Sequence, residues 1–184
     1  FPNVFTIHDH QEVQAILERT TQEEIDRLRA EGIRSVMSSH TVYDRIDQLT
    51  RLLQLDMPPV KRTLLVVLRN ATPELEQMLA RQSITADVIC HESELTGALY
   101  ASADLVTVLD GAESYGEYYL EDLVNGFKYS DVSITRKTRT DEAHFVIREA
   151  EGATVNAMIW REAFPYEQFS EGKIEGKTLF LDAL

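Results

Sequence analysis

Two acidic residues, Asp110 and Glu113, follow an apolar segment, residues 105–109, that is typical of a buried strand. Two small residues separate them, and an amphipathic segment typical of a helix comes next. Carboxylates at the end of a parallel strand, opposite a helix start, lie where open α/β sheets place ligands and metal ions. Two interpretations are open: a weak site for Mg²⁺ or Mn²⁺, or a solvated turn whose acids favour the dipole of the following helix.

Short strands and helices alternate in the region that should position these acids. Apolar runs predict strands at 63–68, 87–90 and 105–109, and helices are expected at 73–82, 92–102 and 117–127. This alternation predicts an α/β fold, a mainly parallel sheet flanked by helices, with 64–68 and 105–109 as neighbouring central strands. Segments 133–135, 144–148 and 154–160 predict an antiparallel extension, followed by a short helix at 161–164 and a glycine-containing loop at 170–176.

The first part of the chain has a different texture. Residues 13–55 show apolar positions at a helical period, and Thr21 with Glu24 forms the pattern of a capping box. Gly32 is the expected end of that helix. Pro58 and Pro59 then break the helical pattern, so we predict a helical segment at 1–57 and an α/β domain at 60–184.

Composition narrows the function classes. The net charge of −13 argues against binding to nucleic acid or to an anionic membrane surface, because both need basic patches. No apolar run is long enough to span a bilayer, and the single cysteine, Cys90, suits a reducing, cytoplasmic setting. The chain begins with Phe1 and Pro2 and has no signal-peptide pattern, which favours a piece of a longer protein.

The strand, acidic loop and helix at 104–124, with Tyr115, Gly116 and Tyr119 in the loop and helix, resemble family-2 type glycosyltransferases of the GT-A fold. Gln82 at the end of the preceding helix is similar to a glutamine often found there in that family. Residues 1–56 resemble instead the tail of a family-1 type, GT-B glycosyltransferase, through the pattern from His40 to Arg45. Together the resemblances imply a fragment of a multi-domain bacterial glycosyltransferase for cell-surface glycans, whose other domains are its partners.

The resemblance also implies roles for individual residues. Asp110 and Glu175 would be catalytic, and Asp110 and Glu113 would hold the metal. A nucleotide-sugar or glycan acceptor would be bound by Glu92, Tyr115 and Arg136. Ordinary roles remain open for these last three: a helix-starting acid, a core aromatic ring and an exposed strand end.

Two elements of the family pattern are weakened in this chain. The Asp-x-Asp spacing that a metal-dependent transferase uses becomes Asp110 followed by Gly111 and Ala112, and Lys177 stands near the expected catalytic base. One hypothesis is therefore a degenerate module for binding or positioning, and the other is an active metal-dependent hexosyltransferase. If the loop is exposed, replacing Gly111 and Ala112 by aspartate should rebuild a metal site at little cost in stability.

Overall fold

The computed structural model describes residues 5–55, 61–137 and 145–181. The chain divides into two compact units, which fall within Phe1–Met57 and within Pro58–Ala183. Within the described ranges, no helix combines the length and the apolar character needed to cross a membrane.

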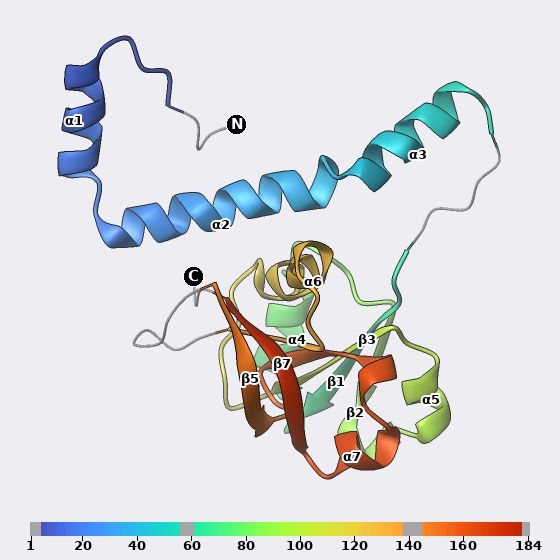
Figure 1. The fold of residues 1–184 in the computed structure, drawn as a ribbon. Helices are drawn as coiled ribbons and strands as arrows, with labels where there is room; N and C mark the ends of the chain where they lie inside the picture. Colours follow the sequence, from blue (N-terminus) through green and yellow to red (C-terminus); the bar gives the residue numbers. More distant parts are fainter. Residues whose placement is uncertain (1–4, 56–60, 138–144, 182–184) are drawn as a thin grey trace. The chain divides into compact units, whose positions relative to one another are not determined.

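The described residues of the first unit form three helices, each of which starts at a side-chain cap. They are α1 (His10–Arg19), α2 (Gln22–Ser39) and α3 (Val42–Leu52), capped by Asp9, Thr21 and Thr41 (Figure 1). The predicted cap at Thr21 is confirmed, because its hydroxyl accepts a hydrogen bond from the backbone N–H of Glu24 at 3.2 Å. The predicted end at Gly32 is wrong, since α2 continues through it to Ser39. One interior glycine costs a helix only about 1 kcal/mol, which the rest of an 18-residue helix outweighs.

The described residues of the second unit form one seven-stranded sheet. Its strands are β1 (Leu64–Arg69), β2 (Val88–His91), β3 (Leu105–Asp110), β4 (Ile134–Lys137), β5 (Val146–Ala153), β6 (Ala157–Trp160) and β7 (Lys173–Leu181). They lie in the order β2-β1-β3-β6-β4-β7-β5. The pairs β1–β2, β1–β3 and β4–β7 are parallel, and β3–β6, β4–β6 and β5–β7 are antiparallel. The α/β fold, the central parallel pair β1–β3 and the antiparallel extension are thus confirmed, although the sheet as a whole is mixed.

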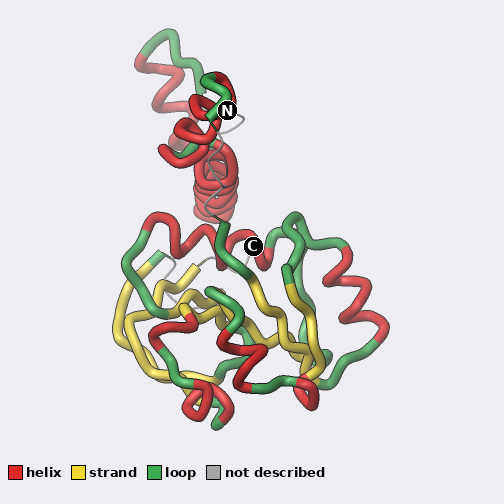
Figure 2. The backbone as a smooth tube through the Cα atoms, turned by 90° about the vertical axis from the view of Figure 1, so that its right-hand side faces the viewer, coloured by secondary structure: helices red, strands yellow, loops and turns green. Residues whose placement is uncertain are grey.

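Helices cover both faces of this sheet (Figure 2). One face packs against α4 (Pro73–Ala80) and α6 (Tyr119–Tyr129), which contribute Leu75 and Leu120 to its core. The other packs against α5 (Gly97–Ala101) and α7 (Tyr166–Ser170), which contribute Tyr100 and Phe169. Short 3₁₀ turns at Glu92–Glu94 and Arg161–Ala163 complete the unit.

Two predicted elements differ from the structure. The helix expected at 92–102 is a 3₁₀ turn followed by the short α5, because Thr96 is extended and caps α5 by accepting a hydrogen bond from Leu99 N–H at 3.2 Å. The glycine-containing loop expected at 170–176 is wrong, since β7 begins at Lys173. Its pairing with β5, whose residues lie 20 or more positions earlier in the chain, decides this conformation, and local composition does not reveal such pairing.

Candidate functional site at the carboxyl ends of β1 and β3

The carboxyl ends of β1 and β3 form the point at which the chain order of the sheet reverses. β2 lies on one side of β1 and β3 on the other, so the connections after β1 and β2 run in opposite directions. Ligands of open α/β sheets bind outside the strands at such a switch point. Arg69 and Asp110 lie opposite each other there, because the register pairs the last residues of β1 and β3.

Asp110 makes hydrogen bonds within the fold. One carboxylate oxygen accepts from the backbone N–H of Ala112 at 3.0 Å, and both oxygens lie 3.3 Å from the amide nitrogen of Asn70. The first bond closes a turn around Gly111, and the second ties the end of β3 to the residue after β1. The carboxylate therefore shapes the loop as well as facing the edge of the sheet.

Gly111 is held against the backbone of the neighbouring strand. Its N–H donates to the carbonyl of Arg69 at 3.0 Å, and a Cβ at this position would lie 2.0 Å from the carbonyl oxygen of Asn70. The expectation that Gly111→Asp would be tolerated is therefore wrong. The loop does expose Ala112 and Glu113, but its glycine has no room for a side chain.

The donor set at this edge does not fit a divalent cation. Glu113 is exposed, and the contact of this residue with Asp110 is the turn hydrogen bond from its N–H to the Asp110 carbonyl at 3.1 Å. In the part of the chain that the structure describes, no three His, Cys, Asp or Glu residues come together as a metal-binding group. Mg²⁺ needs near-octahedral oxygen ligands, whereas here a single carboxylate, already hydrogen-bonded, ends β3.

Glu92, predicted to bind substrate, is engaged by Arg69 instead. The Arg69 Nε donates to both carboxylate oxygens of Glu92, at 2.9 and 3.0 Å. This hydrogen bond, with the charges of Glu92 and Asp110, raises the pKa of the Arg69 guanidinium. Forked pairs of this kind fix geometry strongly, so Glu92 links the end of β2 to the end of β1.

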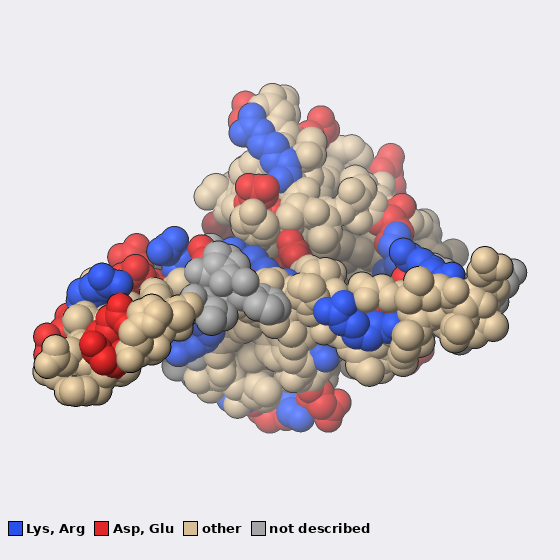
Figure 3. All heavy atoms as spheres, turned by 90° about the horizontal axis from the view of Figure 1, so that it is seen from above, with Lys and Arg blue, Asp and Glu red and all other residues tan. Residues whose placement is uncertain are grey.

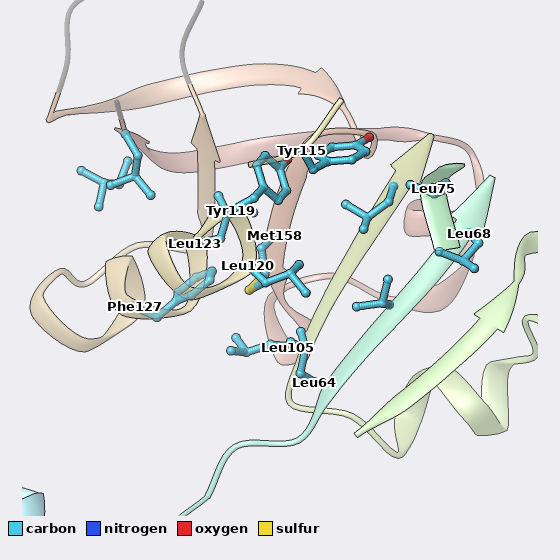
Figure 4. Packing of buried hydrophobic residues seen from close by; sticks show 14 residues of the cluster. Leu64, Leu68, Leu75, Leu105, Tyr115, Tyr119, Leu120, Leu123, Phe127 and Met158 are labelled. Atoms are coloured by element: carbon cyan, nitrogen blue, oxygen red, sulfur yellow. The ribbon is translucent and has the colours of Figure 1, made fainter. Parts of the chain in front are cut away.

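Tyr115 supports the loop from inside. It is 8% exposed; its hydroxyl accepts from the Asp110 N–H and donates to the side-chain oxygen of Asn156, both at 2.8 Å. Burial raises the pKa of Tyr115 to about 12, so the hydroxyl stays protonated and keeps its role as donor. Figure 4 shows Tyr115 beside Tyr119, at the end of the core opposite Leu64 and Leu105. This arrangement agrees with the core-aromatic interpretation of Tyr115.

Gln82 joins the loop to α6. Its side-chain amide donates to the carbonyl of Gly116 at 2.7 Å and accepts from the N–H of Leu120 at 3.0 Å. A single side chain thus satisfies both the end of the loop and an unpaired N–H in the first turn of the helix. The glutamine noted in the sequence holds the acidic loop in place.

The structure does not join the remaining predicted residues to Asp110. Glu175 lies in β7 opposite Glu151 of β5, is exposed, and makes no described contact with Asp110. Arg136 in β4 donates to the carbonyl of Ala153 at 2.6 Å and packs against Gly152. The two proposed catalytic acids therefore do not form a described pair, and Arg136 braces the end of β5.

Sequence reasoning missed Asn70 and Asn156, although both frame the loop. Each adopts a left-handed backbone conformation, with φ of 48° and 60°. Asparagine tolerates this region better than most residues, so an asparagine directly after or before a buried strand was the available signal. The hydroxyl of Tyr119 is buried and has no hydrogen-bond partner in the described parts of the chain, which only the packing could reveal.

Comparison of the sequence with models of known protein families and with curated proteins finds no match for this chain.

Proposed function

We propose that the second unit is a GT-A-like domain, degenerate as a transferase, that binds or positions a hydroxyl-rich ligand such as a glycan acceptor within a larger bacterial glycosyltransferase. One observation carries this proposal. The acidic side chains at the switch point are engaged within the fold, Asp110 by Ala112 and Asn70 and Glu92 by Arg69.

Electrostatics support binding over transfer. Transfer from a nucleotide-sugar needs a metal ion or free cationic groups to stabilise the departing diphosphate. At this edge the charge of Arg69 is balanced by Glu92, and Asp110 and Glu113 leave an acidic surplus. Carboxylate and amide oxygens accept hydrogen bonds from sugar hydroxyls, so the same groups suit a neutral polyol better than a diphosphate.

An active metal-dependent hexosyltransferase is the second candidate. Asp110 at the switch point favours it, because this is the position at which open α/β sheets bind nucleotides. Gln82 holds the loop between β3 and α6 in one conformation, as a catalytic loop would require.

Calorimetric titration of a UDP-hexose with Mn²⁺ into this chain distinguishes the degenerate module from the active transferase. The degenerate module should bind at best in the millimolar range, since one hydrogen-bonded carboxylate compensates the ion poorly. Asp110→Ala tests the loop, and Glu171→Ala, an exposed acid after α7, is the matched control. Micromolar binding that is lost in Asp110→Ala and kept in Glu171→Ala would establish the active enzyme instead.

The same pair of variants in the full-length transferase tests catalysis. We expect Asp110→Ala to leave glycosyl transfer within a few-fold of the unsubstituted protein. A loss above about a hundredfold, roughly 2.7 kcal/mol of barrier, with an unchanged circular dichroism spectrum, would overturn the proposal and make Asp110 catalytic.

A further inference from the structure

A second polar site lies at the other ends of the central strands. A pocket of about 430 Å³ forms where Arg62 leads into β1, Trp160 ends β6 and the segment 130–133 follows α6. Its volume falls in the range of small-molecule sites. Phe127 and Trp160 form an aromatic wall, with their ring centroids 6.0 Å apart. Figure 4 shows Phe127 on the side of the core near Leu105, away from Tyr115.

Arg62 is the unusual residue of this pocket. Its guanidinium lies over the Trp160 ring, 4.5 Å from the centroid, which fixes the side chain in one position. Its Nη1 atom is buried and has no hydrogen-bond partner among the residues that the structure describes. A buried cationic donor without an acceptor is unfavourable, so this atom is suited to an incoming anionic oxygen.

Other lining groups point to the same kind of ligand. Lys177 brings a second positive charge, and its ion pair with Asp131 is loose, at 3.5 Å with a fully exposed Asp131 carboxylate. Ser133 lines the pocket as well, and a hydroxyl is both donor and acceptor. Asp131 also lines the pocket and the other lining residues are uncharged, so Arg62 and Lys177 against Asp131 leave one net positive charge in a chain with a net charge of −13.

Figure 3 shows acidic side chains interspersed with basic ones over the face that it presents. An anion near this acidic chain gains most where cations gather beside a low-dielectric aromatic wall, because the interaction is screened least there.

We propose that this pocket binds a small ligand with a phosphate or carboxylate group, which Arg62 and Lys177 hold while its apolar body contacts Phe127 and Trp160. The site is separate from the switch point, since Leu105, the first residue of β3, pairs with Trp160, while Asp110 ends the same strand. Its occupancy therefore does not depend on whether the acidic loop is active.

Fluorescence gives a direct measurement, because Trp160 is the single tryptophan of the chain. Phenyl phosphate, benzoate, inorganic phosphate and neutral benzyl alcohol are titrated while Trp160 emission is followed, with calorimetry on the same samples. We expect saturable binding of phenyl phosphate or benzoate. The ligand that binds more tightly identifies the preferred anionic group, phosphate or carboxylate. Inorganic phosphate and benzyl alcohol should bind at least about tenfold more weakly, since each lacks one half of the ligand.

Variants assign the binding to named groups. Arg62→Gln should weaken binding at least about tenfold, and Lys177→Gln about threefold, because charge-assisted hydrogen bonds are stronger when buried. Arg81→Gln and Lys173→Gln, exposed cations away from the pocket, are the matched controls and should bind as the unsubstituted chain does.

Three outcomes would overturn the proposal: no saturable binding below about 10 mM, equal binding of benzyl alcohol, or unchanged affinity in Arg62→Gln. If Arg62→Gln does not fold, the affinities of Arg62→Lys and Lys177→Gln test the proposal instead. Unchanged affinity in both folded variants contradicts the site, and weakened affinity in both supports it.

Discussion

The two units of this chain form their secondary structure for different reasons. In the helical unit, each helix starts at a cap, yet its described buried residues are only Asp26, Ala30 and Thr50. Large apolar side chains on α3 stay exposed, with Leu52 at 79%. In the α/β unit, β1 and β3 are buried along almost their whole length.

This difference separates local from tertiary stabilisation. Capping hydrogen bonds act within a few residues, so they specify where the three helices start. A strand has no such local partner, and β1 and β3 persist because both faces of the sheet are covered. Substitutions should therefore have large effects in the α/β unit and small effects on the exposed face of α3.

The largest effect is expected for Leu65→Ala in β1. Leu65 is fully buried, so we expect the α/β unit to lose about 2–5 kcal/mol of unfolding free energy. Urea unfolding followed by Trp160 fluorescence measures this unit alone, because the chain has no other tryptophan. A loss below about 1 kcal/mol would mean that the comparison overstates the role of burial.

The next largest effect is expected for Gly111→Asp, which should lower the unfolding free energy by about 2 kcal/mol or more. The new Cβ would lie 2.0 Å from the Asn70 carbonyl oxygen. Ala112→Asp is the matched control in the same exposed loop and should stay within about 0.5 kcal/mol. The same urea titration compares them. Equal stability of the two variants would show that the loop can move away from β1.

The contribution of Asp104 to the stability of the α/β unit should depend on pH. Hydrogen bonds from the N–H and the hydroxyl of Thr63, at 2.7 and 2.8 Å, lower the pKa of this carboxyl. At neutral pH, Asp104→Ala should cost roughly 1 kcal/mol.

The sign of the pH effect follows from the lowered pKa. The contribution of Asp104 is complete above the unfolded pKa of about 3.9 and is lost as pH falls through the folded value. The gap between the urea midpoints of the two proteins should therefore stay the same from pH 7 to about pH 4 and narrow below that pH. A gap that stays constant would show that the carboxylate charge plays no part.

The smallest effect is expected for Leu52→Gln on α3, within about 0.5 kcal/mol. Thr41→Ala, which removes the capping box of the same helix, should cost about 1 kcal/mol. Helical circular dichroism during thermal unfolding compares them. If Leu52→Gln lost more helix than Thr41→Ala, the exposed apolar face of α3 would have a stabilising contact, and the contrast between the units would fail.

Elements with strong local signals were predicted well. Thr72 and Pro73 indicate the start of α4, and the structure begins the helix at Pro73 with the Thr72 hydroxyl accepting from Leu75 N–H. The apolar runs of β1 and β3 gave the central strands. Asp110 was correctly expected at the end of a parallel strand, because strand ends follow from where the apolar run stops.

The residues that surround Asp110 and its loop could not be predicted from the sequence. Asn70 lies 40 residues before it and Asn156 lies 46 residues after it, and each reaches the loop only through the packing of neighbouring strands. The same holds for the pairing of Arg69 with Glu92 and for the pocket around Arg62.

The sequence by itself determined the caps of α2 and α4, the buried central strands and the placement of an acidic loop after β3. These depend on hydrogen bonds and apolar periodicity within a few residues. Only the tertiary structure decided that β7 is a strand, that Gly111 has no space for a side chain and that Arg62 carries a buried donor with no partner in the described ranges. Each of these depends on atoms brought together from distant parts of the chain, whose contacts leave no periodic pattern in the residues themselves.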